Sequence, residues 1–182
     1  MTGARPQAVL RSARLVLRPF RADDAPRVQV LVDDPDIARN TLTIPHPYPQ
    51  GMAAKWIEGH AQSWDERRNA VWAVCLERDE VVGAAGLRLE PAHRRAELGY
   101  WIAREHWGRG IATEAVRALV EHAFDDLGLE RLFAHHFPWN PASGRVLEKA
   151  GMLREGVLRG HVWKDGRAED NVLYGLTRKD RA

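Results

Sequence analysis

The 182-residue sequence contains one cysteine, Cys75, and no long run of apolar residues. A single cysteine excludes an internal disulfide and suits a reducing compartment, and the apolar neighbours of Cys75 indicate an inert, buried side chain. No segment has the length and hydrophobicity that a membrane-spanning helix needs, and the first residues lack the apolar stretch of a signal peptide. We therefore expect a cytoplasmic protein.

An excess of charge of one sign is also lacking. The 27 Lys and Arg residues against 25 Asp and Glu leave a net charge of +2, and no RNA-binding motif is present, so nothing indicates a polyanion-binding surface. The 45% hydrophobic content is ordinary for a globular domain with a substantial core. We expect a flexible tail over residues 1–12, a single domain over residues 13–178, no metal site, and a monomer or homodimer.

The most informative stretch covers residues 97–127. It opens with an alternating, aromatic-rich segment, which is typical of a strand, ending near Ile102. A short loop with Gly108 and Gly110 follows, and from Ile111 the apolar residues recur at helical spacing. Such a loop offers backbone N–H groups and the positive end of a helix dipole to a phosphate, and glycines let the ligand touch the backbone.

Three kinds of phosphate-binding loop compete for this stretch. A P-loop ends in Gly-Lys-Ser/Thr, and this loop contains no lysine. A dinucleotide fingerprint needs Gly or Ala where Thr113 stands, and its acidic residue ends the next strand, whereas Glu130 precedes that strand. The third pattern, Gln/Arg-x-x-Gly-x-Gly/Ala, belongs to acyl-CoA loops, and Trp107–Ala112 (WGRGIA) departs from it only at Trp107.

The rest of the chain divides into alternating and helical patterns separated by proline, glycine and charged residues. Strands are predicted over Arg14–Phe20, Ala70–Glu77, Val81–Glu90, Arg131–Phe137, Met152–Val157, Leu158–Lys164 and Asn171–Leu176, and further helices over residues 21–34, 51–68 and 140–151. Asn40–Gln50, with three prolines, is predicted to be a loop. The crossover through the helix after Ile111 requires its two flanking strands to be parallel.

A second informative stretch, Pro138–Gly151, contains a favourable N-cap residue and reads Asn-x-x-Ser…Leu-Glu-Lys-x-Gly. Together with ELGYWI, WGRGIATEAV and the closing RGHVWKDGRAEDNVLYGL, it resembles the Gcn5-related N-acetyltransferase (GNAT) superfamily. The similar branch is that of the ribosomal-protein N-terminal acetyltransferases. The resemblance implies an α/β (α+β) fold: a mixed, mostly antiparallel sheet of about seven strands with a central splayed parallel pair and about four helices.

The resemblance also implies acetyl-CoA as co-substrate. In the family the glycine loop holds the CoA diphosphate, and backbone groups of the splayed central strand pair with pantetheine. The start of the helix that corresponds to residues 140–151 reaches the pantetheine arm. The cofactor-binding residues implied here are Ile102, Ala103, Trp107, Gly108, Arg109, Gly110, Ile111, Ala112, Thr113, Asn140 and Ser143. A well-capped short helix is the simpler interpretation of Asn140.

Proton transfer is the second requirement, because an attacking amine must be neutral. Glu97 stands where the family often places a base, and a salt bridge to Arg94 or Arg95 is the structural alternative. His135 and His136 lie on the adjacent predicted strand, where one of them faces the same cleft because successive residues point to opposite faces. An ordinary packed or surface histidine is the alternative there.

The departing thiolate needs a proton or a strong hydrogen bond. Many members of the family use a tyrosine in the helix after Asn140, and the matching position here is Leu147. Ser143, one turn earlier, is the predicted substitute, with a hydrogen bond to the sulfur as its safer role.

The family places the acceptor beside the two early helices and the loop between them. Ile44, His46 and Tyr48, with His136, are therefore the predicted substrate-binding residues. The sequence indicates an acetyl-CoA-dependent N-acetyltransferase whose acceptor is a primary amine, either a protein N-terminal α-amine or a small molecule. A non-catalytic acyl-CoA-binding domain is the main alternative, and a dinucleotide-binding oxidoreductase is a weaker one.

Overall fold

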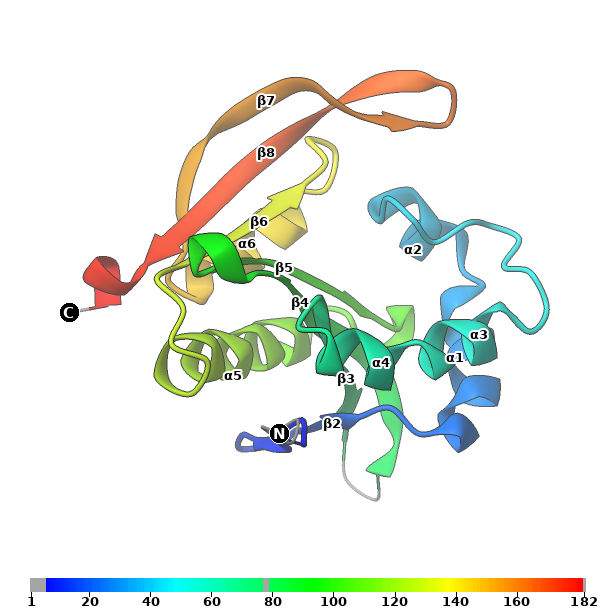
Figure 1. Ribbon diagram of the computed structural model, residues 1–182. Helices are drawn as coiled ribbons and strands as arrows, with labels where there is room; N and C mark the ends of the chain where they lie inside the picture. Colours follow the sequence, from blue (N-terminus) through cyan, green and yellow to red (C-terminus); the bar gives the residue numbers. More distant parts are fainter. Residues whose placement is uncertain (1–5, 77–78, 182) are drawn as a thin grey trace.

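The computed structural model describes residues 6–76 and 79–181, and these form one eight-stranded sheet between two layers of helices (Figure 1). The strand order is β1-β2-β3-β4-β5-β6-β8-β7. The strands are β1 (Leu10–Arg11), β2 (Val16–Pro19), β3 (Asn69–Cys75), β4 (Val81–Glu90), β5 (Arg95–Ile102), β6 (Arg131–His136), β7 (Leu153–Lys164) and β8 (Arg167–Thr177). Only β5 and β6 pair in parallel, as the crossover through a helix requires.

Each face of the sheet has its own apolar cluster. The larger cluster lies between the sheet and the helices α5 and α6, and the smaller one joins the other face to α1, α2 and α3. The described α-helices are α1 (Ala25–Val32), α2 (Pro35–Asn40), α3 (Met52–Glu58), α4 (His60–Asp65), α5 (Ile111–Asp125) and α6 (Pro141–Lys149). The alternation along the strands therefore decides which side chains face which helical layer.

The predicted fold class is confirmed, with differences in detail. Two strands predicted over residues 152–164 form one long strand, β7, whose pairing with β8 is irregular between Leu158 and Val162. The helix predicted over residues 51–68 divides at Gly59, a poor helix former, into α3 and α4. An additional helix, α2, forms because the Asp34 side chain accepts hydrogen bonds from the N–H groups of Asp36 and Ile37.

The expected tail is shorter than predicted. Leu10 and Arg11 form β1 by pairing with Leu17 and Val16, and the Trp72 indole donates to the carbonyl of Ala8 at 2.8 Å. Residues 1–5 of the expected tail lie outside the described residues. Leu10 and Arg11 are therefore part of the sheet edge, and Ala8 is held to Trp72 of β3. None of the helices in the described ranges is long and apolar enough to cross a bilayer.

The central parallel pair separates after three residue pairs. Arg95, Ala96 and Glu97 pair with Arg131, Leu132 and Phe133. Beyond Glu97, β5 keeps pairing with β4 as far as Ile102, while β6 pairs only with β8. The predicted splay of the central pair is confirmed, and backbone groups on one edge of β5 are left without a strand partner.

Candidate active site

The glycine loop connects the separated end of β5 to α5. Gly108 and Gly110 have φ values of +74° and +77°, a conformation in which other residues are strained. In the described chain, no backbone hydrogen bond outside helices and strands uses the N–H of Gly108, Arg109 or Gly110. These donors are therefore free at the N-terminus of a 15-residue helix, as binding of a phosphate requires.

Space beside the loop is open. A Cβ atom added to Gly108 would have no neighbour within 4 Å, and one added to Gly110 would meet only the Arg14 guanidinium, at 3.5 Å. Arg14 donates to the carbonyl of Arg109 at 3.1 Å and to a carboxylate oxygen of Glu114 at 2.8 Å. The N-terminal segment thus fixes the loop to the first turns of α5 and puts a positive charge beside it.

The backbone of β5 differs from one expectation. The N–H of Ala103 donates to the carbonyl of Val82 at 2.8 Å, so this N–H is not free to pair with pantetheine, whereas the resemblance implies such pairing at Ala103. Because backbone polar groups alternate sides along an antiparallel strand, those of Ile102 and Tyr100 point to the edge that β6 has left. The carbonyl of Ile102 accepts a hydrogen bond from the Trp107 indole at 2.6 Å.

Trp107 replaces the Gln or Arg of the loop pattern, and its indole connects the loop to the end of β5. The side chain is still about half exposed, at 44%. The residues predicted to contact the cofactor, from Trp107 to Thr113, therefore lie together, and their contacts with it stay predictions.

Tyr100 is a candidate functional residue that the sequence argument did not identify. Its hydroxyl lies 2.8 Å from the Ser143 hydroxyl, bridging β5 and the first turn of α6. Burial raises the pKa of Tyr100 to about 12 despite that hydrogen bond, so the phenol is protonated at neutral pH. Alternation along β5 placed Tyr100 on the α6 face, and this was the signal available in the sequence.

The residues predicted in α6 are held as a helix start. The Asn140 side chain accepts a hydrogen bond from the Ser143 N–H at 3.3 Å, as an N-cap does. Leu147 is fully buried in the larger apolar cluster. Ser143 and Tyr100 are therefore the hydroxyl groups at the place where a proton donor was expected.

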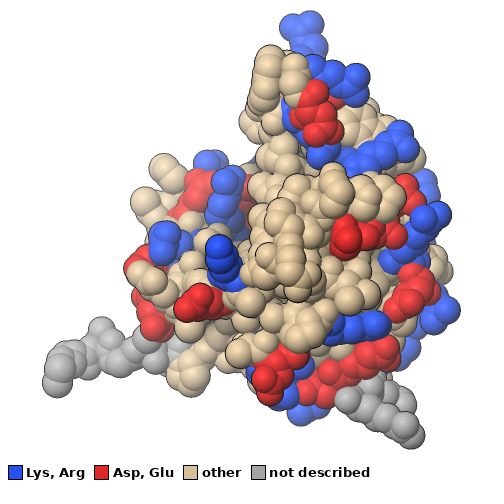
Figure 2. Space-filling model, turned by 90° about the vertical axis from the view of Figure 1, so that its right-hand side faces the viewer, with Lys and Arg blue, Asp and Glu red and all other residues tan. Residues whose placement is uncertain are grey.

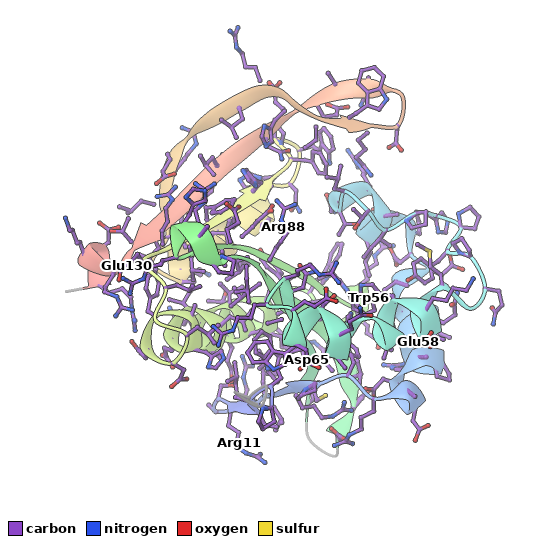
Figure 3. All side chains as sticks on the ribbon, viewed as in Figure 1. Arg11, Trp56, Glu58, Asp65, Arg88 and Glu130 are labelled. Atoms are coloured by element: carbon purple, nitrogen blue, oxygen red, sulfur yellow. The ribbon has the colours of Figure 1, made fainter. Side chains whose placement is uncertain are left out.

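Glu97 is paired, but not with the predicted arginines. Its two oxygens contact the Arg88 guanidinium and, at 3.2 Å, Nδ1 of His135, while Arg94 pairs with Glu130 and Arg95 with Glu90. The hydrogen bond from His135 and the charge of Arg88 outweigh burial and hold the pKa of Glu97 below its usual value. In Figure 3 the labelled Arg88 lies on the side of the sheet toward the β7–β8 hairpin.

The two histidines of β6 face opposite sides of the sheet. His135 faces the side of Glu97, whereas His136 is 9% exposed and packs its ring near Tyr174, against α6. The Nδ1 atom of His136 lies 2.8 Å from the carbonyl of Phe137. His135 is thus the histidine that shares a face of the sheet with Glu97, and a role for His136 in binding substrate stays a prediction without support from its position.

The other predicted acceptor residues lie in the loop between α2 and α3. Tyr48 is 9% exposed and packs with α1 and α3, and its N–H donates to Asp33, which also contacts His46. Ile44 is partly buried against the same cluster. Contact of these three residues with an acceptor stays a prediction, and Tyr48 serves chiefly as core.

The β7–β8 hairpin arches toward α2 (Figure 1). The Lys164 ammonium donates to the carbonyls of Ala38 and Thr41, at 3.1 Å and 2.9 Å, and so joins the hairpin to the end of α2. The face of the molecule on that side shows acidic and basic side chains interspersed around an uncharged band, without a large field of one sign (Figure 2).

A parallel pair that separates beside a glycine loop with free amides, within a mostly antiparallel sheet, defines the architecture of the GNAT acetyltransferases. A family model described as the acetyltransferase (GNAT) domain matches residues 14–153. The chain therefore belongs to the GNAT acetyltransferase family.

Individual relatives agree with this assignment. The chain is 33% identical over 173 residues to the uncharacterized N-acetyltransferase YoaA of Bacillus subtilis (strain 168), covering 93% of this chain and 97% of YoaA. It is 31% identical over 121 residues to the ribosomal-protein-serine acetyltransferase of Escherichia coli (strain K12), covering 66% and 67% of the two chains. The microcin C7 self-immunity acetyltransferase MccE, solved with acetyl-CoA and AMP, superposes with a TM-score of 0.85 at 17% identity, covering 97% and 99%.

Proposed function

We propose that this protein transfers the acetyl group of acetyl-CoA to a primary amine by direct attack of the amine on the thioester. The observation that carries the proposal is the set of unbonded amides at Gly108, Arg109 and Gly110, next to the unpaired edge of β5. The solved complex of MccE with acetyl-CoA, in the same fold, supports it.

The glycine loop and the free edge of β5 bind different parts of acetyl-CoA. Amides from Gly108 to Ala112 bind the diphosphate, where the dipole of α5 favours negative charge. The backbone groups of Tyr100 pair with the pantetheine arm, and the N–H of Ile102, whose carbonyl already bonds the Trp107 indole, is the donor for the developing oxyanion. In acyl-transfer enzymes such a donor contributes about 2.7–4 kcal/mol to the transition state.

The hydroxyl groups of Tyr100 and Ser143 support the departing sulfur. Because the pKa of Tyr100 is raised to about 12, the phenol keeps its proton at neutral pH and donates to Ser143 or to a thiolate. The pair replaces the tyrosine that is absent at Leu147.

The acceptor is a protein N-terminal α-amine or a small amine. An α-amine, with a pKa of about 7.7–8.0, is roughly a tenth neutral at pH 7, whereas a lysine amine is neutral in about one molecule of a few thousand. The name of the E. coli relative, a ribosomal-protein-serine acetyltransferase, supports the first class. The interspersed acidic and basic side chains on the face shown in Figure 2 favour neither class of amine.

An acceptor screen with acetyl-CoA tests the proposal by measuring release of free thiol. The panel contains peptides that begin with Ala or Ser, polyamines and aminoglycosides, and we expect acetylation of at least one class, verified by a mass increase of the acceptor. Stoichiometric binding of acetyl-CoA without transfer to any amine of the panel would instead favour a non-catalytic acyl-CoA-binding domain.

A further inference from the structure

We propose that His135 is the base that takes the proton from the acceptor amine, and that Glu97 is a positioning residue that orients its imidazole. This inference rests on the proposed amine acetylation, and it reassigns the proton acceptor within that reaction.

Glu97 is poorly suited to act as the base itself. One of its oxygens contacts Nδ1 of His135, the other is paired with the Arg88 guanidinium, and the carboxylate side chain is 27% exposed. These two partners also keep the pKa of Glu97 low, far from the pKa of an amine. A base works best when its pKa lies near the working pH, which favours an imidazole over a paired carboxylate.

The contact with the Glu97 carboxylate orients the His135 imidazole in the way that a general base requires. Glu97 contacts Nδ1, and no hydrogen bond among the described residues involves Nε2. A carboxylate at Nδ1 fixes the tautomer that carries its proton there and leaves the Nε2 lone pair available, which is the arrangement of serine hydrolases. The His135 ring also packs edge-on against Phe133 at 5.7 Å, so its orientation is restrained from two sides.

The position of His135 matches the place where the reaction must occur. Phe133 is the last residue of β6 that pairs with β5, opposite Glu97, and His135 is two residues further along. At about 3.3 Å per residue, its Cα lies roughly 7 Å past the point where the strands separate. An amine that reaches a thioester held at the edge of β5 from this face of the sheet therefore passes the imidazole.

The proton balance uses groups already named. The ammonium of the acceptor gives one proton to Nε2 of His135, and the freed lone pair forms the C–N bond with the thioester carbonyl carbon. The C–S bond then breaks and its electron pair stays on sulfur, which accepts a hydrogen bond from the Tyr100–Ser143 pair. The nitrogen loses its second proton as the amide forms, that proton reaches the thiolate through solvent, and His135 releases the first proton to solvent.

Several charged groups surround His135. Arg88 lies on β4, Glu97 on β5, and His161 on β7 places its exposed ring 5.3 Å from the His135 ring. Arg95 stacks over Phe133 at 5.3 Å. A general base acts only in its unprotonated form, so the proposal predicts a turnover rate that falls on the acid side.

The test compares three variants of the full chain: His135→Gln, Glu97→Gln and, as matched control, His161→Gln. With the panel acceptor that the unaltered protein acetylates best, kcat is measured across pH. We expect His135→Gln to lower kcat about 100-fold and abolish its acid limb, as loss of a general base does, with unchanged affinity for acetyl-CoA. Glu97→Gln loses about 10-fold and keeps an acid limb, and His161→Gln changes kcat less than threefold.

The opposite pattern would overturn the assignment: an active His135→Gln with its acid limb intact, beside a Glu97→Gln that has lost it. A second measurement needs no acceptor. Nitrogen-15 NMR of the histidine-labelled protein is expected to show His135 protonated on Nδ1 at neutral pH, and protonation on Nε2 instead would contradict the proposal. If the unaltered protein acetylates no amine, the proposed function fails, while the NMR result still decides the orientation of His135.

Discussion

At the scale of single residues, the positions of the site with the strictest backbone requirement are the two loop glycines, Gly108 and Gly110. Gly110 adopts φ +77°, and its open side would accept a large side chain without contacting the core. We expect Gly110→Trp to remain folded, at a cost of about 1–2 kcal/mol for the left-handed conformation, and to lose binding of acetyl-CoA because the indole fills the phosphate space.

Calorimetric titration with acetyl-CoA measures that loss. Gly128→Trp is the matched control, because Gly128 also has a positive φ, +66°, and open space, at the other end of α5. Unchanged affinity in a folded Gly110→Trp would remove the diphosphate from this loop.

A different residue-scale prediction concerns the buried ion pair between Arg18 and Asp24. The side chains are 6% and 8% exposed and join through two hydrogen bonds of 2.8 Å. Burial acts to raise the pKa of Asp24, but the hydrogen bonds from Arg18 and Arg21 outweigh it and lower the pKa. We expect Asp24→Asn to lower the free energy of unfolding by about 3 kcal/mol, since it leaves the Arg18 charge partly uncompensated.

The sign of the pH effect follows from the lowered pKa of Asp24. The stability that the carboxylate contributes is present above the unfolded value, about 3.9, and is lost as pH falls through the folded value. Denaturant unfolding at pH 7 and at pH 3 should therefore show a larger difference between the parent and Asp24→Asn at pH 7. Asp23→Asn, an exposed neighbour, is the control and should change stability by less than about 0.5 kcal/mol. Equal stability of parent and Asp24→Asn at pH 7 would contradict the account.

At the scale of elements, local patterns predicted the strand, glycine loop and helix well. The period changes from two to 3.6 at the loop, and the glycines adopt the left-handed conformation that their position requires. That the N–H of Ala103 is already bonded to β4 could not be predicted, because the side to which a backbone group points depends on the register with β4. That register is set by pairing of distant residues, such as Ile102 with Gly83, and no local pattern contains it.

The contact between Tyr100 and α6 could be predicted only in part. Alternation along β5 gives the face on which Tyr100 lies, but its partner depends on how α6 packs. Its hydroxyl crosses from β5 to Ser143. We expect Tyr100→Phe to lower kcat about 10- to 100-fold, the equivalent of one hydrogen bond to a charged group of about 1.5–3 kcal/mol, with unaltered affinity for acetyl-CoA. The measurement compares steady-state rates of the parent and Tyr100→Phe, with acceptors that have the same amine pKa but differ in size. A kcat within twofold of the parent would show that the departing sulfur does not depend on this hydroxyl.

Over the whole molecule, the site is assembled from segments that the sequence separates widely. Glu97 meets Arg88 from β4 and His135 from β6, 38 residues further on, whereas the sequence indicated its near neighbours Arg94 and Arg95. Lys164 reaches Ala38 across 126 residues. Such partners depend on the order of the strands in the sheet and on the curvature of the β7–β8 hairpin. The pattern of apolar and polar residues along the sequence specifies neither of these. The acceptor side was therefore the least predictable part of the site.

A crystal structure of the protein with bound acetyl-CoA would show whether the glycine loop and the edge of β5 hold this ligand. We expect diphosphate oxygens at about 3 Å from the amides of Gly108–Ala112, and the pantetheine arm along the edge of β5 at Tyr100 and Ile102. Acetyl-CoA bound elsewhere with the loop amides unoccupied, or a β6 that pairs along β5 as far as Ile102, would contradict this expectation.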